Sequence, residues 1–161
     1  MYKRQVRNLG VFQGFWFLLV LGGDGFVPVA LCWLLYHVVH YSDPRERWLL
    51  PIYTALGIAM DSILAALNVY HFASDAWPIP LWLMGLWLIF PTTLGHGLRW
   101  CWSGKPWILA ASAIGAALTY IGGARLSDLV FPLGELSSVV IISGCWMLYF
   151  GLVRVMSSEK S

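Results

Sequence analysis

The sequence predicts an all-α membrane protein: a polytopic bundle of six transmembrane helices, forming one domain over residues 1–161, with both termini in the cytoplasm. Hydrophobic residues make up 59% of the chain and charged residues only 11%, against about 25% charged residues in soluble domains. The apolar residues form continuous runs and do not alternate with polar ones, which favours helices over a membrane barrel. Basic residues also gather on one side of the predicted spans.

Clusters of glycine, proline and polar residues separate the apolar runs and set the order of the helices. No small-residue cleavage site follows the basic N-terminus, so we expect the first run to be a retained helix. The tetrapeptide GGDG joins the first two runs into a hairpin, and both runs need flanking residues to reach the roughly 20 residues of a membrane span. The expected helices cover residues 8–22, 26–40, 49–72, 81–98, 107–122 and 136–156.

The distribution of basic residues favours six spans. With both termini inside, nine basic residues lie on the cytoplasmic side and only Arg125 lies outside, which is a strong positive-inside bias. Fusing the first two runs into one helix would give five spans and would separate the N-terminal basic residues from Arg45 and Arg47. We therefore expect a multi-pass membrane protein with both termini in the cytoplasm. The nine inner residues are Lys3, Arg4, Arg7, Arg45, Arg47, Arg99, Lys105, Arg154 and Lys160.

Asp61 stands in the apolar stretch GIAMDSILAALNVY and is the first candidate for a functional residue. It follows the start of the expected third helix by a distance that predicts a position near the bilayer midplane. An acid at that depth costs about 2.5 to 3.5 kcal/mol on insertion scales, so it is expected to face the bundle interior and to have a partner. The alternative is a neutral Asp61 that only forms a hydrogen bond to another helix.

Other polar residues follow helical spacing and extend this candidate site. On the third helix, Asn68 shares a face with Asp61. On the fourth, Thr92 and His96 lie on a similar stripe, and Pro91 predicts a kink because it removes a backbone hydrogen bond. The first helix adds Gln13, for which interhelical hydrogen bonding is the simpler role. The predicted substrate-binding residues are Asp61, Gln13, Asn68, Thr92 and His96.

Three histidines raise the alternative of a metal or haem site. His37, His40 and His96 are predicted to lie at similar depth near the inner ends of their helices, and imidazoles bind metals and haem. No second carboxylate accompanies them in this interpretation, and interfacial histidines are common. The prediction therefore assigns no metal ligand and no cofactor. The three cysteines lack paired spacing and are expected to be buried thiols.

Several function classes are disfavoured. The net charge of +2 and the lack of a basic, aromatic-rich soluble segment argue against nucleic-acid binding. No nucleophile elbow, zinc-protease, phosphate-loop or dinucleotide motif is present, so the sequence gives no support for a particular enzyme. Rows of small residues in the fifth helix favour tight packing within the bundle, with a homo-oligomer or a partner membrane protein as the alternative.

Three segments, NLGVFQGFWFLLVLGG, GIAMDSIL and LIFPTTLGHGLRWCW, resemble an uncharacterised bacterial inner-membrane family, catalogued as domain of unknown function 2878. The resemblance covers nearly the whole chain and supports the predicted topology. It implies no reaction, although members of the family are often found beside genes for fatty-acid modification, which suggests a connection with lipids. The residues that carry it are Asn8, Phe12, Gln13, Trp16, Asp61, Thr92, Thr93, Leu94 and Trp100.

The sequence thus leads to one preferred function and two alternatives. The preferred hypothesis is a membrane protein that binds or translocates a hydrophobic or amphipathic small molecule, related to lipids, with membrane lipids as partners. Asp61 would be its polar anchor or a proton-coupled group. The first alternative is a metal- or haem-binding membrane enzyme or redox subunit. The second is a non-catalytic subunit of a membrane complex or an assembly factor.

Overall fold

The computed structural model describes residues 2–73 and 78–158, with side chains from residue 5 onward. Lys160 and the side chains of Lys3 and Arg4, which contribute to the predicted charge bias, lie outside this part. The described residues are all-α apart from two short strands, and the chain forms two compact units. The first comprises Met1–Ala59 and Ile79–Arg99, and the second Met60–Pro78 and Trp100–Ser161. Helix α3 contributes residues to both.

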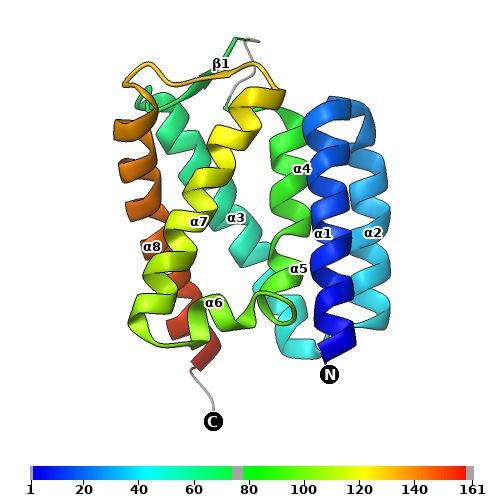
Figure 1. The fold of residues 1–161 in the computed structure, drawn as a ribbon. Coiled ribbons are helices and arrows are strands. Elements are labelled where there is room, and N and C mark those ends of the chain that lie inside the picture. Colours follow the sequence, from blue (N-terminus) through cyan, green and yellow to red (C-terminus); the bar gives the residue numbers. More distant parts are fainter. Residues whose placement is uncertain (1, 74–77, 159–161) are drawn as a thin grey trace. The chain divides into compact units, whose positions relative to one another are not determined.

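The first unit begins with the predicted helical hairpin. Helix α1 (Tyr2–Gly22) and helix α2 (Val27–His40) run side by side in opposite directions and are joined by the 3-10 turn η1 (Gly23–Phe26) (Figure 1). Gly23 has a φ of +65°, a conformation that glycine adopts without strain. The Asp24 carboxylate accepts a hydrogen bond of 2.9 Å from the Trp82 amide, and so ties the turn to the start of α4 (Leu81–Ile89).

Helix α3 (Pro44–Ala66) follows α2 after a very short turn. Asp43 caps its first turn, because Asp43 Oδ1 accepts a hydrogen bond of 2.8 Å from the Glu46 amide. Proline at the first helical position suits this geometry, since a helix leaves that amide unpaired in any case. The helix therefore starts five residues before the predicted position, and its first turn lies directly beyond the last turn of α2.

The predicted fourth helix is divided into short pieces. Within the predicted range 81–98, helix α4 ends at Ile89 and α5 (Pro91–Leu94) is a single turn. Helix α6 (Arg99–Ser103) lies between the predicted fourth and fifth helices. Pro91 has no amide hydrogen to donate to the Trp87 carbonyl, and the Thr54 hydroxyl of α3 donates to that carbonyl instead, at 3.0 Å. Gly57, one turn further along α3, leaves room for the Trp87 ring, which a Cβ atom would overlap. The hydrogen bonding of the helix is thus interrupted at Pro91, but Phe90 keeps helical backbone angles (φ −51°, ψ −46°), so the helical path continues to Leu94.

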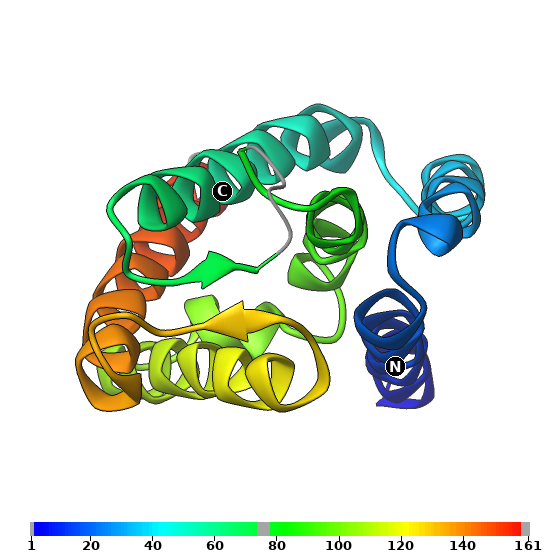
Figure 2. The same ribbon diagram turned by 90° about the horizontal axis from the view of Figure 1, so that it is seen from above.

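The second unit contains an antiparallel pair of long helices, α7 (Pro106–Leu126) and α8 (Glu135–Ser158) (Figure 1). Strands β1 (His71–Phe72) and β2 (Leu129–Val130) pair antiparallel, with His71 opposite Val130 (Figure 2). The prediction that the third helix continues to residue 72 was wrong. Asn68 has a φ of +54°, and this left-handed residue ends the helix.

The composition of the helices confirms a multi-pass membrane protein at a coarse level. Within the described residues, four helical segments are long and apolar enough to cross a bilayer: Gln5–His40, Pro44–Ala66, Pro106–Leu126 and Glu135–Ser158. The first of these contains both helices of the hairpin. Large apolar side chains are also well exposed, for example Leu148 at 72% and Leu35 at 65%. Such exposure suits a lipid environment rather than water.

Candidate metal site

Three polar side chains meet at one end of the first unit, each from a different element. His37 lies in the last turn of α2, Glu46 lies in the first turn of α3, and His96 lies in the turn after α5. The turn between α2 and α3 brings the first two together, because the Tyr41 and Ser42 amides both donate to the His37 carbonyl. The helix dipoles favour this arrangement, since an acid suits a helix N-terminus and an imidazolium suits a C-terminus.

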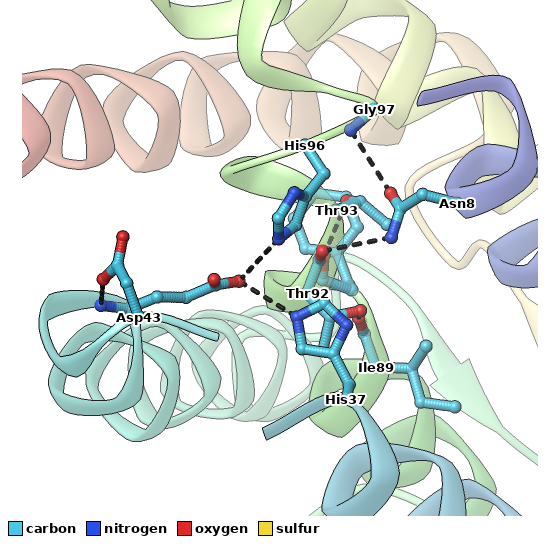
Figure 3. Close-up of polar contacts among 10 residues, drawn as sticks. Asn8, His37, Asp43, Ile89, Thr92, Thr93, His96 and Gly97 are labelled. Carbon is cyan, nitrogen blue, oxygen red and sulfur yellow. Dashed lines mark hydrogen bonds and ion pairs between the residues drawn. The ribbon is translucent and has the colours of Figure 1, made fainter. Parts of the chain in front are cut away.

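The distances within this group are short. Glu46 Oε1 lies 3.0 Å from His37 Nε2 and 3.3 Å from His96 Nε2 (Figure 3). One ligand atom from each residue lies within 4.8 Å of the other two. The imidazole rings of His37 and His96 are nearly perpendicular, at 76°, with their centroids 5.3 Å apart. Both rings therefore present Nε2 toward the same carboxylate oxygen.

The three side chains differ in solvent exposure. The side chain of His37 is 2% exposed, that of Glu46 15% and that of His96 35%, so the site is reached from the His96 side. The hydrogen-bonding contact with Glu46 raises the pKa of His96 against the opposing effect of burial, and the negative charges of Glu46 and Asp43 act in the same direction. The contact has an ion-pair distance but poor hydrogen-bond angles, so His96 Nε2 is enclosed without a well-aligned partner.

These residues fit a divalent transition-metal ion. Two imidazoles and one carboxylate form a recurrent ligand set for zinc and for non-haem iron, and it leaves coordination positions open for water or substrate. With metal–ligand bonds of about 2.0 to 2.2 Å, neighbouring ligand atoms are roughly 3.0 to 3.5 Å apart. The two contacts to Glu46, at 3.0 and 3.3 Å, lie in that interval, and the ligand atoms of the two histidines lie within 4.8 Å of each other. Without a metal, the same distances suit imidazole N–H groups that approach a single carboxylate oxygen.

The structure brings together two of the three histidines that the sequence raised as an alternative metal or haem site, His37 and His96. His40 does not join the group, because it is exposed, its Nδ1 lies 3.0 Å from the Tyr36 carbonyl, and its ring stacks on Tyr36. Glu46 was missed, since the segment SDPRER was treated only as a linker. The signal was present in that segment: an Asp-Pro pair followed by Glu is typical of a helix start, which puts Glu46 next to the end of the preceding helix.

The predicted substrate-binding residues have different environments, and three of them belong to the first unit. Gln13 is exposed on α1. Thr92 is buried, and its hydroxyl donates to the Ile89 carbonyl at 2.7 Å, a local bond at the helix break. Only His96 belongs to the group with His37 and Glu46. Within this unit, the functional candidates are therefore fewer than the polar stripe suggests.

The other two predicted residues belong to the second unit. Asp61 is fully buried, and the Tyr120 hydroxyl of α7 donates a hydrogen bond of 2.7 Å to Asp61 Oδ1. The Tyr70 hydroxyl donates to the Asp61 carbonyl at 3.3 Å. Asp61 lies five residues before the end of α3, nearer the helix end than predicted. Asn68 is exposed beyond that end, so its predicted place on the face of the helix was wrong.

Comparison with known proteins shows the family. The chain matches the family described as "Protein of unknown function (DUF2878)" over residues 5–152, and it belongs to that family. No curated protein and no solved structure matches the chain. The resemblance noted in the sequence is thereby confirmed, and the function has to be argued from the residues themselves.

The contact between His96 and Glu46 predicts a pH-dependent stability in metal-free protein. Because the fold raises the pKa of His96, the protonated form is favoured in the folded state. Protonated His96 therefore contributes its full stabilisation of the folded protein below the unfolded-state pKa of about 6.5. This contribution is lost as the pH rises through the higher pKa of the folded state. With chelator present, wild type should exceed His96→Gln in melting temperature most at about pH 6 and least at about pH 9. A constant difference would contradict this, and His40→Gln is the control.

The hydrogen bond from the Tyr120 hydroxyl indicates a structural role for Asp61. Tyr120→Phe removes the donor at 2.7 Å from a fully buried carboxyl group. We expect the free energy of unfolding to fall by about 1 to 3 kcal/mol, as for other buried groups that lose a partner. Denaturation in detergent micelles measures this change. Thr119→Ala, at an exposed neighbour whose hydroxyl bonds only within its own helix, is the matched control and should change stability less.

Proposed function

We propose that this member of a family of unknown function is a multi-pass protein of the bacterial inner membrane that binds one divalent transition-metal ion through His37, Glu46 and His96. The observation that carries the proposal is the convergence of two imidazole nitrogens on one carboxylate oxygen, at 3.0 and 3.3 Å. A second observation supports it. His96 Nε2 is enclosed without a well-aligned hydrogen-bond partner in the described residues, and a metal ion would satisfy it.

We also propose the six-span topology, with both termini in the cytoplasm. The segment Gln5–His40 is a hairpin, so it accounts for two crossings rather than one. The apolar stretch Leu81–Leu94 is shorter than the others and would supply the sixth, supported by its neighbours. Arg45 and Arg47 follow α2 directly, so the positive-inside bias would put the metal site near the cytoplasmic surface.

The substrate class that we propose is the one predicted from the sequence, a hydrophobic or amphipathic small molecule related to lipids. The three ligands come from the ends of apolar elements, where a lipid's polar group and its chains meet different surroundings. A metal held there supplies a Lewis acid that polarises a bound oxygen. Glu46 and His37 would fix the ion from the buried side, and His96 would close the site on the exposed side.

One observation favours a non-catalytic role instead. Asp61, the predicted polar anchor, already accepts a hydrogen bond from Tyr120 and is fully buried, as expected for a group that fixes helix packing. A subunit or assembly factor would need only such structural contacts. Recovery of a stable membrane partner, together with metal-free protein, would favour this alternative.

Metal binding by the purified chain tests the proposal. After chelator treatment and its removal, Co²⁺ or Zn²⁺ titrated into protein in detergent should bind at one ion per chain. Glu46→Gln and His37→Gln should weaken binding by more than the roughly 10- to 100-fold loss typical of outer-shell partners, because each removes a ligand. His40→Gln should bind as wild type does, since His40 lies outside the group. Wild-type protein that binds no ion, or equal binding by Glu46→Gln and His40→Gln, would contradict the proposal.

A further inference from the structure

We infer that Asn8 is a positioning residue of the metal site, because its side-chain amide holds the turn that carries His96. This inference rests on the proposed function. Asn8 lies on α1 and touches neither His37 nor Glu46 through any hydrogen bond among the described residues. Its effect on the site would pass through the backbone of residues 92–97.

The Asn8 amide uses both of its polar groups on this turn. Its Nδ2 donates to the Thr92 carbonyl, and its Oδ1 accepts from the Gly97 amide, each at 3.3 Å (Figure 3). The two partners fix the orientation of the amide, since a carbonyl can only accept and a backbone amide can only donate. Asn8 thereby bridges the two ends of the segment, and His96 lies between them.

The segment needs support from outside because its own helical bonding is incomplete. Pro91 ends α4, and α5 is only one turn long. Inside the turn, the Thr93 carbonyl accepts hydrogen bonds from both the His96 amide at 3.1 Å and the Leu98 amide at 2.8 Å. This turn fixes the local shape of the chain. Its attachment to α1 depends on the Asn8 bridge and on packing.

Gly97 makes the close approach of α1 possible. A Cβ atom at this position would lie 2.7 Å from Leu9 Cγ and 2.9 Å from Asn8 Oδ1, which is closer than real Cβ contacts. The glycine thus allows the backbone amide to reach the Asn8 side chain. Asn8 and Gly97 are matched to each other, although 89 positions separate them in the sequence.

Of the three proposed ligands, His96 depends most on support from another part of the chain. His37 lies within a regular helix, and Glu46 lies in a helix turn capped by Asp43. His96 is the most exposed of the three and lies in a turn. The position of its Nε2 relative to Glu46 therefore follows the position of the turn. Outer-shell groups of this kind set the orientation of metal ligands and hence metal affinity.

Cobalt binding by the full chain in detergent tests the inference. Asn8→Ala removes both contacts, and Asn8→Asp keeps the acceptor for Gly97 but places an oxygen against the Thr92 carbonyl. Both variants should bind Co²⁺ about 10- to 100-fold more weakly than wild type. The visible absorption of the bound cobalt should also change, because it reports ligand geometry. His40→Gln, at an exposed residue outside the group, should match wild type in both measurements.

A second control separates positioning from simple loss of stability. Tyr120→Phe is expected to lower the melting temperature through a contact in the other unit, so it should leave the cobalt spectrum unchanged. Wild-type affinity and spectrum in the Asn8 variants would overturn the inference and leave the proposed function intact. Wild-type protein that binds no cobalt would overturn both. If Asn8→Ala does not fold, the near-isosteric Asn8→Asp decides the question.

Discussion

The carboxylate of Glu46 organises the first unit, because two imidazoles from distant parts of the chain approach the same oxygen atom. Burying a carboxylate near a membrane is costly unless its charge is compensated. His37 supplies a partner from the end of α2, and His96 supplies another from the turn after α5. A metal ion would replace the shared protons by stronger bonds to the same atoms, so the arrangement suits both a metal-free and a metal-bound form.

The end of the helical stretch at Leu94 makes this meeting possible. A helix that continued beyond Leu94 would carry His96 along the same axis, whereas the chain turns there and places His96 beside Glu46. The cost of the missing backbone hydrogen bond at Pro91 is limited by polar side chains, since Thr54 donates to the freed Trp87 carbonyl, and Thr93 donates to the Phe90 carbonyl at 2.6 Å. The threonines are therefore part of the architecture that presents His96, without being ligands themselves.

The sequence predicted the class of fold and most helices, because long apolar runs and their punctuation follow from composition and local chemistry. It predicted two of the three residues in the site, but not Glu46, whose role depends on how two helices meet end to end. The prediction for Asn68 was wrong for a different reason: asparagine can end a helix in the left-handed conformation, but the apolar residues on both sides of it favoured a longer helix. Asp61 could be identified from the sequence because a carboxylic acid within an apolar run is energetically costly to insert into a membrane. Its partner Tyr120 is 59 positions away and could not be identified from spacing.

The central claim is that His37, Glu46 and His96 hold a metal ion together. The most direct test is a crystal structure of zinc-loaded protein with diffraction data on both sides of the zinc absorption edge. The account predicts one anomalous peak about 2.0 to 2.2 Å from Nε2 of both histidines and from a Glu46 carboxylate oxygen. An imidazole–carboxylate cluster with its direct contacts intact and no zinc between these side chains would contradict it.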